Sequence, residues 1–144
     1  GSAGQLLASA GGGSSAMTWV AQQQIIPLSS AAAVAQNSTV FEVSAANATE
    51  GLAQGVCPKA GTFKNLYLAT GTVGGSSQSV TATWRVAGSD STLTCAVATG
   101  ATTCNDVTHT IACAAGNPYS LKVVTSATTG SVGFVSGGIE FDSP

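Results

Sequence analysis

Apolar and polar residues alternate with a period of two along most of this chain, and this pattern predicts β-strands. The clearest run is QSVTATWRVAG, in which the apolar residues share one face of an extended chain. No window carries an apolar stripe at helical spacing over three turns, so no long helix is expected. The residues on the expected buried faces are Val80, Ala82, Trp84 and Val86; Phe41 and Val43, on either side of Glu42; Leu93, Cys95 and Val97; Val107, His109, Ile111 and Cys113; and Tyr119, Leu121 and Val123.

Two further runs complete the pattern. In TFKNLYLAT the phase slips between Phe63 and Leu66, which predicts a β-bulge near Lys64 and Asn65. The last run, SVGFVSGGIEFD, is expected to close the sheet. Turn-forming segments such as AGSDS, ATGAT and AAGNP separate the runs at roughly 8 to 12 residue intervals. The predicted fold class is therefore all-β, a jelly-roll-like antiparallel β-sandwich with an extended N-terminal arm.

The N-terminal segment differs from the rest because small side chains dominate it. We expect residues 1–35 to form a Gly/Ser/Ala-rich linker or assembly arm, and residues 36–144 to form the sandwich domain. One strand is expected within the arm, from Gln23 to Leu28, ending near Pro27 because proline cannot donate to a ladder. The bulky apolar residues of the arm are candidate assembly contacts: Leu6, Leu7, Trp19, Ile25, Ile26 and Leu28.

Four cysteines allow three disulfide pairings. If LTCAVATGATTC is a hairpin with Thr-Gly as its two-residue turn, Cys95 and Cys104 form a non-hydrogen-bonded pair, where Cα atoms approach to about 4.5 Å. A bridge is predicted there, and by elimination Cys57 pairs with Cys113; the alternative is that the latter two are buried free thiols. No C-x-x-C occurs, and no metal site is expected. Disulfides would place the protein outside a reducing cytosol.

Charge is scarce in this chain. Only 7% of the residues are charged, against roughly 25% in an average soluble protein. Because charge keeps dissolved molecules apart, this composition favours assembly into an oligomer. The four basic residues are too dispersed to form an electrostatic footprint for nucleic acid, so neither DNA nor RNA is an expected partner. No run approaches the ~18 consecutive apolar residues of a membrane-spanning helix, so no membrane insertion is expected.

The sequence offers little catalytic chemistry. A Ser-His-Asp arrangement has to use the single His109, whose nearest acid is Asp106. A spacing of three on an extended strand puts these side chains on opposite faces, unless the start of the strand is irregular. Glu140 and Asp142 share a strand face, which we interpret as a solvated edge rather than a cation site. Neither an enzymatic activity nor a cofactor is expected.

Exposed aromatic rings are the places to look for sugar contacts, because a ring stacks on the apolar face of a sugar. Trp84 is in phase with a buried face and is expected in the core. Tyr67 and Tyr119 are the candidate surface ligand contacts, and the alternative for both is packing in the core.

The first twenty residues carry the most specific motif. AGQLLASAGGGSSAMTW resembles a linker that recurs in bacteriophage tail-fibre and related structural proteins, although that family often has a proline where this chain has Met17 and Thr18. From Pro58 to Asp142, stretches such as CPKAGTFKNLYLATGT and AAGNPYSLKVVTS are similar to β-rich modules of phage virion proteins and to trimeric jelly rolls of the complement and tumour-necrosis-factor type. The residues that match the linker are Ala3, Gly4, Gln5, Leu6, Leu7, Ser9, Gly11 to Gly13 and Trp19.

The resemblance implies a virion surface protein, commonly a homotrimer, without enzymatic activity. The expected function is that of a non-enzymatic phage structural protein, the head module of a tail fibre, located in the virion or outside the cell. Its expected partners are further copies of the chain, other virion proteins and a glycan or protein of the host surface. Alternatives are a capsid decoration or cement protein, a filament in which the Gln23–Leu28 strand adds to the next subunit's sheet, and a carbohydrate-active enzyme.

Overall fold

The computed structural model describes residues 5–8, 18–71, 79–126 and 131–144, without the side chains of residues 5–8, 18–22, 131 and 134. These residues form ten β-strands and one short 3-10 helix. No helix among them has the length and hydropathy needed to cross a membrane. The elements are β1 (Gln5–Ala8), β2 (Thr18–Ala35), β3 (Thr39–Glu42), η1 (Glu50–Leu52), β4 (Gly55–Val56), β5 (Gly61–Thr70), β6 (Val80–Val86), β7 (Ser89–Val97), β8 (Thr103–Cys113), β9 (Pro118–Thr125) and β10 (Ser131–Ser143).

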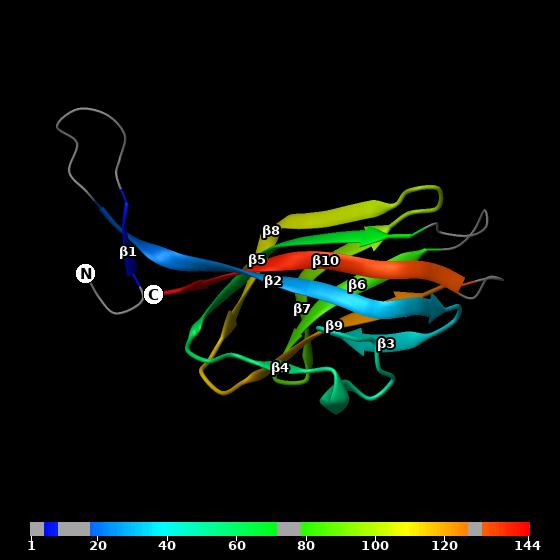
Figure 1. Ribbon diagram of the computed structural model, residues 1–144, viewed down its shortest axis with the longest axis horizontal. Coiled ribbons are helices and arrows are strands. Elements are labelled where there is room, and N and C mark those ends of the chain that lie inside the picture. Colours follow the sequence, from blue (N-terminus) through cyan, green and yellow to red (C-terminus); the bar gives the residue numbers. More distant parts are fainter. Residues whose placement is uncertain (1–4, 9–17, 72–78, 127–130) are drawn as a thin grey trace.

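The strands form two antiparallel sheets that pack against each other (Figure 1). One sheet has the order β1-β2-β10-β5-β8, and the other has the order β3-β9-β6-β7. The short strand β4 pairs with β9 just beyond β3, on the same edge. The predicted all-β, antiparallel sandwich is confirmed. The last strand, β10, lies in the middle of its sheet between β2 and β5.

Aromatic rings form the centre of the core between the sheets. Phe63 of β5 lies against Trp84 of the opposite sheet, with ring centroids 4.8 Å apart, and against Phe141 of β10 at 4.7 Å. All three side chains are buried. The predicted inward faces of β6, β7 and β9 are confirmed, with only Tyr119 half-buried; the buried residues are Val80, Ala82, Trp84, Val86, Leu93, Cys95, Val97, Leu121 and Val123.

The predicted phase of β3 is wrong. Val40 and Glu42 face the interior, whereas Phe41 and the following Val43 are only half-buried. The guanidinium of Arg85 lies over the Phe41 ring, 5.5 Å from its centroid, and this cation–π contact gives the ring a partner on the outer face.

The predicted bulge in β5 is confirmed. Asn65 and Leu66 together oppose the single residue Ile139 of β10, and Asn65 has a φ of 52°. This extra residue shifts the phase of β5, so Phe63 and Leu66 both face the core. Two positions beyond the bulge in β10, Gly137 lies so close to β5 that a Cβ atom there would be 2.1 Å from the carbonyl oxygen of Tyr67.

Strand β2 does not end near Pro27, contrary to the prediction. It pairs with β10 from Gln22 to Ala35, and Pro27 lies opposite Gly138. Ser29 donates its backbone N–H to Val43 O, on the side of β2 away from β10. The backbone nitrogen of Pro27, two residues earlier in the strand, points to the same side. No ladder hydrogen bond is lost at the proline. Residues 22–35 of the predicted arm therefore belong to the sandwich sheet.

The N-terminal part of β2 projects beyond the sandwich, where it pairs with β1 (Figure 1). The 18 residues of β2 span about 60 Å at about 3.3 Å per residue, so one strand joins the projecting hairpin to the sheet. The chain's C-terminal end, Pro144, lies at the same end of the sandwich as this hairpin.

Both predicted disulfides are confirmed. Cys95 and Cys104 are joined with their Cα atoms 5.7 Å apart, and the predicted turn between them is closed by the N–H of Ala101 donating to Ala98 O. However, β7 and β8 belong to different sheets, so this bridge ties the two sheets together. The second bridge joins Cys57, before β5, to Cys113 at the end of β8.

Candidate functional site

A three-residue bulge in β8 brings together the acid and the histidine that the sequence singled out. Lys64 of β5 pairs with Thr110 and Leu66 pairs with Asp106, so residues 107–109 of β8 oppose Asn65 alone. The bulge displaces the alternation of β8. The start of β8 is thus irregular, the exception under which Asp106 and His109 were not expected on opposite faces, and the two side chains lie together.

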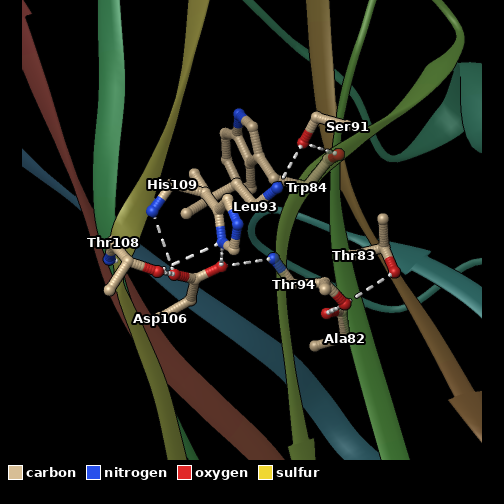
Figure 2. Close-up of polar contacts among 9 residues, drawn as sticks. All are labelled: Ala82, Thr83, Trp84, Ser91, Leu93, Thr94, Asp106, Thr108 and His109. Carbon is tan, nitrogen blue, oxygen red and sulfur yellow. Dashed lines mark hydrogen bonds and ion pairs between the residues drawn. The ribbon is translucent and has the colours of Figure 1, made fainter.

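The Asp106 carboxylate organises this bulge (Figure 2). One oxygen accepts the backbone N–H groups of Thr108 and His109, both at 3.1 Å, and the Thr108 hydroxyl at 3.0 Å. The other oxygen accepts the backbone N–H of Thr94 on β7 at 3.0 Å and contacts Nδ1 of His109 at 2.8 Å. The carboxylate thus replaces ladder partners that the bulge has removed and links β8 to the neighbouring sheet.

These contacts favour the ionised form of Asp106. Burial alone would raise the pKa of Asp106, but the hydrogen bonds from Thr94, His109 and Thr108 outweigh it and hold that pKa well below its usual range. An ionised carboxylate can only accept, so Nδ1 of His109 is the donor. The imidazole, with its side chain 52% exposed, therefore turns Nε2 away from the carboxylate.

Among the described residues, the pair lacks the third member of a nucleophilic triad. A triad needs a hydroxyl or thiol at Nε2, on the side of the imidazole away from the acid. The described hydroxyl that contacts the His109 ring is that of Thr108, and it lies 3.3 Å from Nδ1, the nitrogen that Asp106 already occupies. The arrangement fixes a backbone conformation rather than activating a nucleophile.

Two other strands contain bulges of the same form, and each is closed by a serine. Residues 91–93 of β7 oppose Trp84 alone, and the Ser91 hydroxyl donates to Trp84 O and accepts the N–H of Leu93 (Figure 2). Residues 30–32 of β2 oppose Val135 alone, where the Ser30 hydroxyl accepts the Val135 N–H at 3.0 Å. Asp106 is thus one of three short polar side chains that satisfy a bulged backbone.

Replacing Asp106 by alanine should destabilise the protein by about 3 kcal/mol, because three backbone N–H groups in partly buried hydrogen bonds lose their acceptor. Urea unfolding at pH 7 measures this loss. A lowered pKa stabilises the fold above the usual carboxyl range and ceases to do so as the pH falls, so the difference between wild type and variant should shrink in acid. Asp90→Ala, at a half-exposed carboxylate, is the control and should have a smaller effect. An equal loss for the two variants would contradict the assigned role.

The remaining acids, with one exception, lie beside cations. Lys64 bridges the outward carboxylates of Glu140 and Asp142, at 4.0 Å and 2.6 Å. Arg85 pairs with Glu50 at 2.8 Å and also with Asp90, which Lys122 contacts as well. No cluster of three potential metal ligands occurs among the described residues.

The exception is Glu42, which the sequence reasoning did not single out. Its side chain is fully buried, and neither carboxylate oxygen has a hydrogen-bond partner among the residues that the structure describes. Burial raises its pKa from 4.5 to about 8, so the carboxyl is protonated at neutral pH. It lies in one row with Leu121 and Trp84, whose indole N–H is also without a partner. The sequence signal was the alternation of Val40 with Glu42, which competes with that of Phe41 and Val43.

The two candidate tyrosines occupy different environments. Tyr119 is half-buried, stacks on Trp84 at a centroid distance of 5.4 Å and contacts the edge of Phe63. Burial raises the pKa of its phenol. Tyr67 is 55% exposed on the outer face of β5. Of the two, only Tyr67 presents its ring to solvent as a surface ligand contact requires.

The candidate assembly residues are also divided. Leu28 is buried in the core and Ile26 packs partly against it, whereas Ile25 is 74% exposed. The backbones of Leu6 and Leu7 pair with those of Val20 and Trp19, but the side chains of Leu6, Leu7 and Trp19 lie outside the described part of the structure.

Comparison with protein families and with curated protein sequences gives no significant match. Any function assigned to this chain therefore has to be argued from its own residues and geometry.

Proposed function

We propose that this chain is a non-enzymatic structural protein of a bacteriophage virion, the head module of a tail fibre that contacts the host surface. The observation that carries the proposal is the path of β2. The segment that resembles a tail-fibre linker includes β1 and the start of β2, and the same strand continues into the sandwich sheet. A stem preceding the linker would be joined to the head through β1 and then through β2, which continues without a break into the sandwich sheet.

The strand order supports the jelly-roll interpretation of the head. We number the strands of the sandwich from β2 as the first to β10 as the eighth, and count the short strands β3 and β4 together as the second. The sheet β2-β10-β5-β8 then contains the first, eighth, third and sixth strands. The other contains the second, seventh, fourth and fifth. This is the arrangement expected of two interleaved Greek keys in an eight-stranded jelly roll.

The chemistry of the described residues favours a binding role over catalysis. The Asp106–His109 pair serves a bulge, and five of the six acids contact a basic side chain or histidine within the same chain. Two disulfides suit a location outside reducing compartments, including an assembled virion. A homotrimer would combine several weak contacts with the host into one firm attachment through effective concentration.

Immunogold electron microscopy of the native phage particle, with antibodies against the purified chain, tests the proposal. Label confined to fibre tips, together with a trimeric mass from light scattering, is the expected result. Label spread over the shell in hundreds of copies would replace the proposal by the cement protein, and polymers of the purified chain would replace it by the filament. A monomer that labels no part of the particle would refute a virion role.

A further inference from the structure

One small apolar patch stands out on the outer face of the sheet formed by β2, β10, β5 and β8. Tyr67 of β5 lies opposite Gly138 of β10, the exposed Pro27 of β2 lies opposite the glycine on its other side, and Ile25, which pairs with Glu140, flanks the glycine diagonally. A Cβ atom placed on Gly138 would lie 3.5 Å from Cγ2 of Ile25. Ile25 and Tyr67, 74% and 55% exposed, thus border a floor without a side chain. We call Tyr67, Gly138 and Ile25 the Tyr67 patch.

Polar groups held in fixed positions border the patch. Glu140, in the row next to Gly138, accepts hydrogen bonds from the side-chain amides of Gln23 and Asn65, both at 2.7 Å. Lys64 lies beside the same carboxylate. Each amide nitrogen has a second N–H and the carboxylate has further lone pairs, so the group can still bond a ligand hydroxyl. On the other side of the ring, Asn105 pairs with Tyr67 and is exposed.

The size of the patch indicates its occupant. A stable protein interface buries roughly 800 Å² per partner around several apolar anchors. The Tyr67 patch has one aromatic and one aliphatic side chain, with the small ring of Pro27 in the same row, and the next row of the face holds Ser136 and Ala69. An aromatic ring beside an open floor, with amide and carboxylate groups at its edge, suits a ligand that is apolar on one face and carries hydroxyls around its rim. A single pyranose ring has this form.

We infer that the Tyr67 patch binds one pyranose unit of a host-surface glycan. The inference rests on the proposed function, since it names the ligand that such a head would contact. The sugar stacks one face on the Tyr67 ring over Gly138, and its hydroxyls bond the Glu140, Asn65 and Gln23 groups. The expected affinity is about millimolar per site, because a single sugar ring offers few contacts, and it becomes useful through several copies.

Two-dimensional ¹⁵N NMR of the full chain tests this site. The probes are methyl α-D-glucopyranoside, methyl α-D-galactopyranoside, methyl α-L-rhamnopyranoside and N-acetyl-D-glucosamine, each titrated to about 20 mM, above a millimolar Kd. D-mannitol, an open-chain polyol, is the ligand control. At least one pyranoside should shift the amide signals of Tyr67, Gly138 and their neighbours, and mannitol should not.

Four variants separate the site from general surface effects. Tyr67→Ala should weaken the binding at least tenfold, whereas Tyr67→Phe should keep most of it because the stacking face remains. Gly138→Ala adds a methyl group in ordinary van der Waals contact with Ile25, so the fold is kept but the floor is raised and binding weakens. Val124→Ala, at an exposed position on the outer face of the other sheet, should bind as the wild type does. Unchanged thermal unfolding of each variant shows that the fold is intact.

Failure of the inference can be told apart from failure of the proposed function. No shift with any of the four sugars, equal shifts with mannitol, or shifts that persist in Tyr67→Ala would overturn the sugar site, even if immunogold places the chain on fibre tips. Shifts at the Tyr67 patch together with an unlabelled particle would retain the sugar site and overturn the virion role.

Discussion

The free energy of unfolding of the wild-type protein should fall by about 4 kcal/mol between pH 5 and pH 8, and Glu42→Gln should abolish this fall. The folded protein keeps the Glu42 proton up to about pH 8, whereas the unfolded chain releases it near 4.5. Between these values the folded state binds more protons, so raising the pH favours unfolding by about 1.4 kcal/mol per pH unit. The amide has nearly the same size and does not ionise, so the variant's curve should be flat in this window.

Urea unfolding at half-unit pH steps measures this dependence. The other shifted groups titrate outside the window, since the pKa values of Asp106 and Glu50 are lowered and those of Lys64 and Tyr119 are raised from already high values. Glu50→Gln is the matched control: it removes a carboxylate that pairs with Arg85, so it should lower the whole curve without changing its slope. A wild-type curve that rises between pH 5 and pH 8 would show that Glu42 is not buried in its neutral form.

Removal of the Cys57–Cys113 bridge by a double alanine substitution should destabilise the protein by about 4 kcal/mol, and removal of Cys95–Cys104 by about 3 kcal/mol. The larger effect is expected for the longer loop, since the bridged residues are 56 apart in the first case and 9 apart in the second. A crosslink over a longer loop restricts the unfolded chain more strongly.

The comparison requires both double variants in urea at pH 7, with the fully reduced wild type as reference. The reduced protein should unfold at the lowest urea concentration, and adding reductant should change the Cys57→Ala/Cys113→Ala variant less than it changes the wild type. If the short loop gave the larger loss, its tie between the two sheets would have to stabilise the folded state directly. That result would contradict the loop-length argument.

The strands and the Cys95–Cys104 disulfide could be predicted because their signals are local, whereas the Cys57–Cys113 disulfide followed only by elimination. Alternation fixes which face of β6 is buried, and the turn between Cys95 and Cys104 brings the two cysteines together whatever the remaining topology is. The assignment of β7 and β8 to different sheets was not predictable in the same way. β7 pairs with β6, the strand before it, whereas β8 pairs with β5, which is separated from it in the sequence by two other strands.

The candidate site required tertiary information. Asp106 contacts His109 only because three residues of β8 bulge opposite Asn65, and this bulge is anchored by the N–H of Thr94 on another strand. Glu42 could not be singled out because two alternations compete in β3, Val40 with Glu42 and Phe41 with Val43, and the contact of Arg85 with the Phe41 ring is visible only in the fold. The sequence does contain one general signal for such places: a short polar residue inside a strand, such as Ser30, Ser91 or Asp106, accompanies each three-residue bulge.

The continuous strand β2 also has a mechanical consequence. A pull on the chain upstream of β1, against a load held elsewhere on the sandwich, passes through β1 into β2 and acts along β2, parallel to its pairing with β10. The eleven residue pairs between β2 and β10 then share the force and slide in shear, rather than opening one after another as in a zipper. The attachment of the hairpin to the sandwich should therefore resist tension far better than the few residue pairs between β1 and β2 do, and under load β1 should detach first.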